Sequence, residues 1–518
     1  MKKGKISKLV LLMLSVFLVF SIVLAGCGSA KNKVDDKAAV TAKPVESESA
    51  AKATAKPKLD PVVLTWYFGG TPQADVASVE AEMNKILQEK LNVTLRLKAV
   101  DWGNYEQKMQ LINASGEEYD LAFTSNWMNN YYQNVNKGVY VPLDDLLQKY
   151  APTIMATIPK GGWIANKVNG KIYAVPNYQI WARTDVAWPT KELADKYSLD
   201  VTKVKGIKDL TPFLESVKKG EPNLIPYENS KLGNFRNVLL HYGFEEIAGS
   251  NIPGAIKLDD ANLKVVNQYQ SEEYKSFVGL MREWNQKGFF RKDAATLADT
   301  SADRKAGKYA VLAGGTVKPG GEVEIKALTG KDTLMLPTSK SYLTTGGIIA
   351  TMTGVSKSSK NPERAVMLLD LIFKDKQLYN MLAHGIEGKH YKKINENTVE
   401  AIKDGGYDPN TDWEFGNQFN GYYRSGQKPG IWEETVKLNE TAANSPALGF
   451  SFDPTPVKSE IAQSSTVSQQ YAAMLETGSV DPAQILPEFL DKLKKAGSDV
   501  IIAEQQKQLD AWKLANKK

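Results

Sequence analysis

A strand–helix–strand–helix–strand pattern constrains this fold more than any other feature of the sequence. Three short segments, 62–67, 93–97 and 118–123, are rich in β-branched and aromatic residues, as strands are. Between them, 75–90 and the stretch through Tyr105, Met109 and Ile112 repeat apolar residues at helical spacing. This alternation predicts an α/β fold whose first lobe is a doubly wound sheet flanked by helices.

The same pattern predicts where a ligand binds. In doubly wound sheets, ligands lie beyond the carboxyl ends of the strands. The first and third of these strands end at Phe68–Thr71 and Thr124–Trp127. We therefore expect a binding site at these two turns.

The single cysteine, Cys27, excludes an intramolecular disulfide in this chain of 518 residues. The fold must therefore rest on a large apolar core. Residues 61–518 are numerous enough for two or three domains.

The N-terminus predicts export. Residues 1–26 combine four Lys with an apolar run from Leu9 to Phe20, as secretory signals do. Leu24–Cys27 resembles the bacterial lipobox, which implies that Cys27 carries lipid and holds the protein on the outer face of the membrane, in a Gram-positive-like extracellular setting. Residues 27–60 are polar and Pro-containing, without aromatic residues, and predict a disordered tether.

Charge excludes one class of partner. The formal net charge is +6, but residues 1–26 carry four Lys and no acid, and residues 28–60 carry seven Lys against five acids. The remaining chain is close to neutral and lacks the basic surface of a nucleic-acid-binding protein.

A series of later motifs resembles a known family. The motifs are Lys137–Asp144, Asn169–Pro176, Gly307–Leu312, Leu334–Pro337, Gly346–Ala350 and Lys360–Phe373. In this order they resemble the extracellular solute-binding proteins of ABC importers, in the class of the maltose-binding protein. The tail motifs His384–Tyr391, Gly416-Asn417 and Gly449–Asp453 resemble Gram-positive lipoprotein receptors of the LplA and YtcQ types, which are commonly assigned to oligosaccharide uptake.

The resemblance implies a two-lobed, periplasmic-binding-protein-like (type II) fold that closes on its ligand. Chain crossings are expected near Val175–Ile180, Leu334–Pro337 and His384–Tyr391. Lobe 1 is expected to comprise 61–178 with 336–388, and lobe 2 to comprise 179–335 with 389–518. The predicted C-terminal helices, Pro487–Lys494 and Asp499–Leu514, complete lobe 2. The partners implied are a small polar solute, in the first place an oligosaccharide, and the permease subunits, with the receptor acting as a monomer.

The candidate ligand-binding residues are aromatic and amide side chains near the ends of predicted strands and in loops. Sugars offer apolar faces on which aromatic rings stack, and hydroxyls that pair with planar polar groups. The candidates are Trp66, Tyr67, Thr71, Asn126, Trp127, Asn177, Tyr178, Trp181, Thr316, Trp413, Asn417 and Gln418. Four further tryptophans are interpreted as core or surface residues: Trp102, Trp163, Trp284 and Trp512.

Signals of catalysis, metals or cofactors are weak. The spacing of His384 and His390 does not match a zinc helix, and no nucleophile elbow or phosphate loop is present in the sequence. Asp408, Asn410 and Asp412 resemble the start of a calcium loop whose later positions do not fit. We expect no enzyme activity, cofactor or metal. Two alternatives remain open. One is a secreted hydrolase of polysaccharide, which would need a pair of catalytic carboxylates, although no spacing in the sequence identifies such a pair. The other is a ligand-sensing partner of a membrane kinase.

Overall fold

The computed structural model describes residues 59–516. The predicted signal peptide, Leu24–Cys27 and nearly all of the tether lie outside the described residues. None of the helices within 59–516 is long and apolar enough to cross a membrane.

A five-stranded sheet forms the first half of the fold. Its strand order is β2-β1-β3-β15-β6, in which β1 pairs parallel with β2 and β3, and β15 pairs antiparallel with β3 and β6. The strands are β1 (Val62–Gly69), β2 (Val93–Val100), β3 (Leu121–Thr124), β6 (Ala174–Pro176) and β15 (Met352–Val355). The helices that connect the first three strands are α1 (Val76–Leu91) and α2 (Trp102–Ser115). The predicted strand–helix alternation is thus confirmed.

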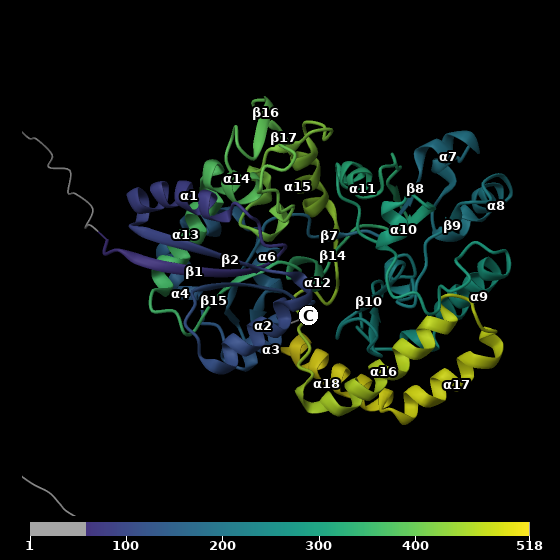
Figure 1. Cartoon of the computed structure of the whole chain (residues 1–518). Coiled ribbons are helices and arrows are strands. Elements are labelled where there is room, and N and C mark those ends of the chain that lie inside the picture. Colours follow the sequence, from purple (N-terminus) through teal and green to yellow (C-terminus); the bar gives the residue numbers. More distant parts are fainter. Residues whose placement is uncertain (1–58, 517–518) are drawn as a thin grey trace, which may run out of the picture. The chain divides into compact units, whose positions relative to one another are not determined.

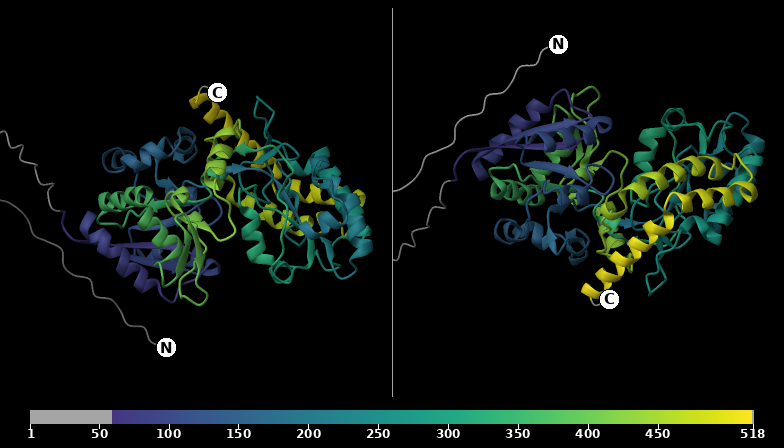
Figure 2. Two further views of the ribbon diagram at one scale, coloured as in Figure 1. Left: turned by 90° about the horizontal axis from the view of Figure 1, so that it is seen from above. Right: turned by 90° about the horizontal axis from the view of Figure 1, so that it is seen from below.

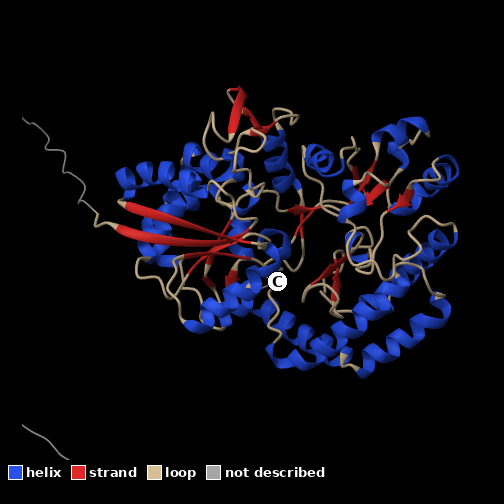
Figure 3. Ribbon diagram, in the orientation of Figure 1, coloured by secondary structure: helices blue, strands red, loops and turns tan. Residues whose placement is uncertain are grey.

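This sheet is covered by helices on both faces (Figure 3). The chain moves from β1 outward to β2 and then back across β1 to β3, so right-handed connections place α1 and α2 on opposite faces. Further helices of this half are α3 (Tyr131–Asn136), α4 (Asp144–Tyr150), α5 (Pro152–Thr157), α6 (Lys160–Ala165), α12 (Thr345–Ile348), α13 (Pro362–Lys374) and α14 (Lys376–His384). Leu64, Leu95, Met83 and Met109 are fully buried in the apolar core between sheet and helices, here called the first core.

A four-stranded sheet, β13-β8-β12-β9, organises a separate second core. Strand β12 pairs parallel with β9 and antiparallel with β8, so β9 and β12 end at the same edge. The strands are β8 (Val186–Pro189), β9 (Ile225–Tyr227), β12 (Tyr309–Ala313) and β13 (Leu336–Pro337). The nearby helices are α7 (Lys191–Lys196), α8 (Thr211–Gly220), α9 (Glu272–Gln286), α10 (Ser301–Lys305) and α11 (Gly321–Thr329).

The chain passes between the two cores through a small sheet of three two-residue strands. These are β7 (Ala182–Arg183), β14 (Tyr342–Leu343) and β19 (Ala443–Asn444), in the order β19-β14-β7. Asn439, on α15 (Ile431–Thr441), fixes the approach to β7. Its Oδ1 accepts hydrogen bonds from the backbone N–H of Trp181 (2.8 Å) and Ala182 (2.9 Å), and its Nδ2 donates to the carbonyl of Gln179 (2.7 Å).

The segment after α14 contributes side chains to the first core. Tyr407 and Phe415 are buried there, and β19, further along the chain, belongs to the small three-stranded sheet. The segment has no regular apolar period; it folds as a small sheet and short 3₁₀ turns. Its strands are β16 (Tyr391–Asn395), β17 (Thr398–Ala401) and β18 (Tyr423–Arg424). The proposed lobe boundaries stay a prediction.

Three C-terminal helices, α16 (Lys458–Leu475), α17 (Pro482–Lys495) and α18 (Ser498–Asn516), lie side by side (Figures 1 and 2, yellow), and α16 and α17 contact α9. Phe489 and Leu493 of α17 are fully buried in the second core. The predicted start of a helix at Pro487 is wrong, because Asp481 caps α17 and Pro482 occupies its first turn. The remaining strands are β4 (Lys167–Val168), β5 (Lys171–Ile172), β10 (Phe244–Glu246) and β11 (Ala255–Lys257).

Candidate ligand-binding site

Three tryptophans meet at the carboxyl edge of the five-stranded sheet, and we call them the aromatic shelf: Trp102, Trp127 and Trp413. The rings of Trp102 and Trp413 are stacked, with centroids 5.7 Å apart and an interplanar angle of 15°. The Trp127 ring lies 5.4 Å from Trp102 and 6.4 Å from Trp413. Trp127 is 51% exposed, and its indole N–H donates to the carbonyl of Ala350 (2.8 Å). The shelf therefore presents a fixed, half-exposed aromatic surface.

Local sequence explains why Trp102 lies here. Asp101 caps α2 by accepting a hydrogen bond from the backbone N–H of Gly103 (3.0 Å), which places Trp102 in the first turn beyond β2. Its ring covers Gly69 at the end of β1, where any side chain would collide with the indole. The sequence interpretation of Trp102 as an ordinary core or surface residue missed this position.

The loop that carries Trp413 is attached to the end of β1 through Glu414. The carboxylate of Glu414 accepts a hydrogen bond from the backbone N–H of Gly69 (2.9 Å), and its carbonyl accepts one from Nδ2 of Asn177 (2.7 Å). Burial raises the pKa of Glu414 well above its usual value. Glu414 therefore ties the loop of Trp413 to the end of β1 from a buried position.

Four of the predicted aromatic residues are buried in the first core: Trp66, Tyr67, Tyr178 and Trp181. The Tyr178 ring lies 4.9 Å from Trp181 and 4.8 Å from Phe419, measured between centroids. These contacts favour a packing role for the four residues. Two of the predicted aromatic residues, Trp127 and Trp413, come together at the shelf.

The predicted polar residues are distributed around the shelf. Asn417 pairs with Tyr178 in a β-bridge, and buried Gln418 donates from its backbone N–H to the Tyr178 carbonyl (2.9 Å). Thr71 is exposed beyond the end of β1. Asn126 is exposed beside Trp127, and its Nδ2 donates to the carbonyl of Gly346 (3.3 Å).

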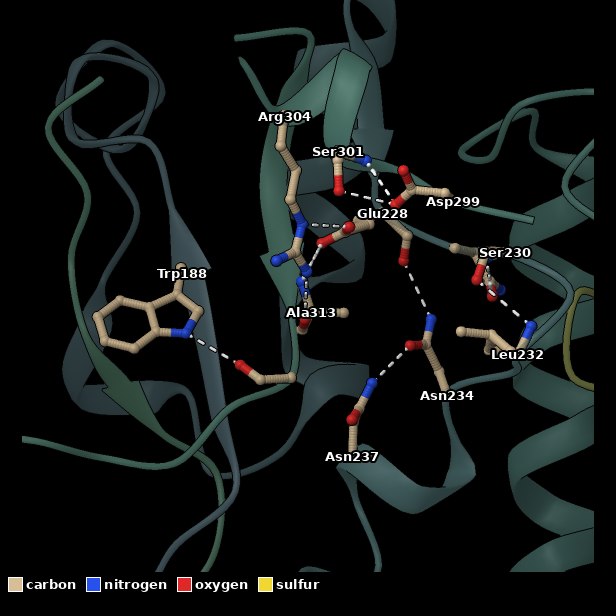
Figure 4. Close-up of polar contacts among 12 residues, drawn as sticks. Trp188, Glu228, Ser230, Leu232, Asn234, Asn237, Asp299, Ser301, Arg304 and Ala313 are labelled. Atoms are coloured by element: carbon tan, nitrogen blue, oxygen red, sulfur yellow. Dashed lines mark hydrogen bonds and ion pairs between the residues drawn. The ribbon is translucent and has the colours of Figure 1, made fainter. Parts of the chain in front are cut away.

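A cavity of about 430 Å³ opens at the edge of the second sheet, where β9 and β12 end. Glu228, directly after β9, forms a two-pronged ion pair with Arg304, with N···O distances of 2.5 and 2.8 Å (Figure 4). The same carboxylate accepts a hydrogen bond from the backbone N–H of Ala313 (3.0 Å). Because both partners are fixed, this pair presents oriented polar atoms to the cavity.

Amides and one indole complete the cavity wall. Nδ2 of Asn234 donates to the Glu228 carbonyl (3.0 Å), and Nδ2 of Asn237 donates to Oδ1 of Asn234 (2.8 Å). The indole N–H of buried Trp188 donates to the carbonyl of Gly314 (3.0 Å). These side chains hold each other in place, so the wall is preformed (Figure 4).

Of the predicted site residues, Thr316 is the one that lines this cavity. Its hydroxyl accepts a hydrogen bond from the backbone N–H of Thr184 (3.0 Å). Glu228, Arg304 and Asn234 were missed by the sequence reasoning. The available signal was the polar run that follows the short strand β9, the same kind of strand end that located the shelf.

Lys318 lies in the cavity, and its charge acts on the loop that carries Trp413. It lines the cavity, where its Nζ lies 2.6 Å from Oε1 of Glu324. Burial alone would raise the pKa of Asp412, but Lys318 and Arg424 outweigh this effect and hold the pKa below its usual value. Asp412 directly precedes Trp413, so the charge of a cavity residue acts on the loop that carries one of the shelf tryptophans.

A second cavity, of about 320 Å³, is lined by Asn126 together with Glu245 and Glu246 of β10. Burial raises the pKa of Glu245 to about 7 and that of Glu246 to about 8. Across residues 59–516, no three or more His, Cys, Asp or Glu side chains are grouped so that they could hold a metal ion.

Known proteins resemble this chain over most of its length. A carbohydrate ABC transporter substrate-binding protein of Streptococcus pneumoniae serotype 4 is 32% identical over 466 residues, which are 88% of this chain and 92% of the relative. The crystal structure of the N-glycan transport solute binding protein NgtS from S. pneumoniae superposes with a TM-score of 0.79 at 30% identity, over 89% of this chain and all of that one.

Two further matches concern the fold and the tail. A structure of the S. pneumoniae substrate binding protein FusA, an EF-hand mutant, has a TM-score of 0.60 at 18% identity, over 88% of this chain and all of that one, and so shows the fold alone. Residues 446–514 match the model of a domain of unknown function, DUF3502. From the extent and identity of the full-length match, this chain belongs to the substrate-binding proteins of carbohydrate ABC transporters, the class of binding protein that the sequence resembles.

Proposed function

We propose that the protein captures an oligosaccharide outside the cell and delivers it to an ABC permease, with the aromatic shelf and the Glu228–Arg304 cavity as two walls of its binding site. The observation that carries this proposal is the half-exposed Trp127, fixed by its hydrogen bond to Ala350 in an aromatic shelf at the end of the first sheet. Sugar rings stack their apolar faces on such indoles, and their hydroxyls pair with fixed carboxylates and amides.

The charges of the cavity support a neutral sugar. Three basic and three acidic residues line it: Arg236, Arg304, Lys318, Glu228, Asp299 and Glu324. Two of the acids are paired with two of the cations, Glu228 with Arg304 and Glu324 with Lys318. A uronic acid would bring a negative charge into a cavity with no surplus of positive charge to balance it.

The named relatives narrow the choice of sugar. NgtS, 30–31% identical to this chain, has been crystallised with Man1GlcNAc and with Man5GlcNAc. We propose that the present protein binds oligosaccharides of the same kind, composed of mannose and N-acetylglucosamine.

A ligand panel tests the function. The purified protein is heated alone and with Man5GlcNAc, kestose or an oligouronate at increasing concentration. A ligand present at a hundredfold excess over its Kd stabilises the folded state by about 2.7 kcal/mol, so the melting temperature rises with the sugar that binds. The expected order is Man5GlcNAc first and the oligouronate last. A panel in which no neutral oligosaccharide raises the melting temperature overturns the proposal.

We further propose that the receptor acts as a monomer, is held by lipid on Cys27 and engages permease subunits. The support for the anchor is the lipobox-like Leu24–Cys27. Replacing Cys27 with Ala should move the protein from the membrane fraction to the medium or leave it unprocessed. Recovery of a mature-size lipoprotein from membranes of the Cys27→Ala strain contradicts the anchor.

A further inference from the structure

One irregular segment, residues 229–237, forms part of the wall of the Glu228–Arg304 cavity, and we call it the cavity loop. It leaves β9 and ends in a short 3₁₀ turn, Phe235–Asn237. Its side chains that line the cavity are Asn229, Ser230, Leu232, Asn234, Arg236 and Asn237. The loop pairs with no strand, so its position depends on contacts with other parts of the chain.

Glu476, the residue that follows α16, holds both ends of this loop. Its side-chain Oε2 accepts a hydrogen bond from the backbone N–H of Phe235 (2.9 Å). Its main-chain carbonyl accepts one from Nδ2 of Asn229 (2.9 Å). Between these points lies Gly233, with φ of +69°, where a side chain would collide with the Glu476 carboxylate. Glu476 therefore accepts hydrogen bonds from the loop at Asn229 and Phe235 and lies directly against it at Gly233.

Glu476 is itself held rigidly on α9. The hydroxyl of Tyr274 donates to Oε1 of Glu476 (3.3 Å). Nδ2 of Asn285 donates to the carbonyl of Thr477 (2.9 Å), and Nη1 of Arg282 donates to the carbonyl of Gly478 (2.9 Å). The loop is thus tied through Glu476 to two packed helices, α9 and α16.

A buried carboxyl at this position is costly. Glu476 is 4% exposed, and burial raises its pKa to about 7, although hydrogen bonds from Phe235 and Tyr274 and the charge of Arg236 oppose this rise. The other titratable neighbours are Glu246 and Tyr269. An apolar side chain of similar size would fill the space without this cost but could accept no hydrogen bond from the loop. The carboxyl is therefore explained by what it holds.

We propose that the C-terminal segment 446–514, which matches a domain of unknown function, braces the ligand cavity, and that Glu476 is the positioning residue through which it acts. This inference rests on the proposed function for its binding readout. Glu476 sets the geometry of Asn229, Asn234 and Asn237, whose side chains line the cavity. The three C-terminal helices serve as the rigid support from which it does so.

The test compares Glu476→Ala and Glu476→Gln with Asp491→Ala, an exposed position on α17 of the same segment. Hydrogen exchange of the amides in 229–237 is measured without ligand, and the Kd for Man5GlcNAc is measured by calorimetry. Loss of a buried hydrogen-bond partner in Glu476→Ala should speed exchange in the cavity loop and weaken affinity by about tenfold or more. Glu476→Gln retains an acceptor for Phe235 and should recover most of both. Asp491→Ala should change neither.

A second variant keeps the test sharp if Glu476→Ala does not fold. Tyr274→Phe removes only the hydroxyl that supports Oε1 of Glu476 and should give a smaller effect of the same kind, about twofold to fivefold in Kd. Because burial raises the pKa of Glu476 to about 7, the wild-type Kd should change between pH 6 and pH 8, and the change should be smaller in Glu476→Gln, where neighbours such as Glu246 still titrate. A purely structural role would not produce this contrast.

Two outcomes overturn the brace: unchanged exchange of 229–237 in a folded Glu476→Ala protein, or affinity equal to wild type in that variant. Failure of the proposed function looks different. In that case wild-type protein binds no oligosaccharide of the panel, and the exchange measurement still decides whether Glu476 holds the loop.

Discussion

The aromatic shelf and the Glu228–Arg304 cavity, the two proposed walls of the binding site, lie at the edges of two different sheets and differ in chemistry. The shelf is made of three indoles, and its exposed member is fixed by one hydrogen bond to Ala350. The cavity is made of paired charges and amides, each held by a neighbour at 2.5–3.0 Å. Stacking tolerates rotation and sliding of a sugar ring, whereas hydrogen bonds demand particular hydroxyl positions. The difference suggests that the shelf supplies affinity and the cavity supplies specificity.

The largest expected effect is on the cavity side. Replacing Arg304 with Met leaves Glu228, whose side chain is 5% exposed, as an unpaired buried charge. Breaking a buried pair from one side costs about 3–5 kcal/mol of unfolding free energy, measured by denaturant titration. The double variant with Glu228→Met should recover much of the loss. The exposed pair Lys191–Asp195 is the control, since its removal should cost less than about 1 kcal/mol.

A substitution at Tyr178 tests whether this residue belongs to the binding site or to the first core. It is 6% exposed and packs on Trp181 and Phe419, so Tyr178→Ala should lower the unfolding free energy by about 3 kcal/mol through the cavity it leaves. Denaturant midpoints and calorimetric titration are measured together. A loss of sugar affinity without loss of stability would place Tyr178 in the site instead.

Trp127 should behave in the opposite way. Trp127→Ala removes a half-exposed indole and should weaken oligosaccharide binding by about 1–3 kcal/mol while changing stability little. Leu111→Ala on α2, an apolar residue that is 61% exposed, is the matched control and should leave the Kd unchanged. If the two variants bind equally well, the shelf is not a wall of the site.

The smallest expected effect concerns pH and the second cavity. The pKa of Glu246 is raised by burial to about 8, so the fold favours the protonated carboxyl. Its contribution to stability is therefore lost as pH rises from about 4.5 to about 8. Glu246→Gln mimics the protonated form. Its melting temperature should equal that of wild type at pH 5 and exceed it by roughly 1–3 °C at pH 8.5. Exposed Glu433→Gln should show no such divergence.

The sequence allowed the first sheet to be predicted well because its signals are local. The expected strand Val62–Tyr67 lies within β1, and the expected helix Asp75–Lys90 nearly coincides with α1. The insertion of β15 between β3 and β6 leaves no such local signal, since it is decided by pairing across distant parts of the chain. Pro487 misled the prediction of α17, because proline usually opens a helix but here lies inside one.

Most of the correctly placed candidates lie on the aromatic side of the site, and Thr316 is the one predicted residue that lines the cavity. Trp127 and Trp413 stood out because indoles near strand ends are rare and large. Glu228 and Arg304 could not be recognised from sequence, since charged residues are abundant and their pairing joins positions 76 residues apart. Glu476 lies still further from the loop it holds, 241 residues from Phe235.

The insertion of β15 beside β3 also sets the order in which the molecule can assemble. Trp127 and its partner Ala350 are 223 residues apart, and the loop that bears Trp413 comes later still. A nascent chain that has emerged only to the end of the second sheet would therefore have β3 paired with β1 but not with β15, and the shelf would lack Trp413 and the Ala350 carbonyl. Such long-range closure makes folding slow. The first half of the polypeptide must wait, with an open sheet edge, until the second half has been synthesised.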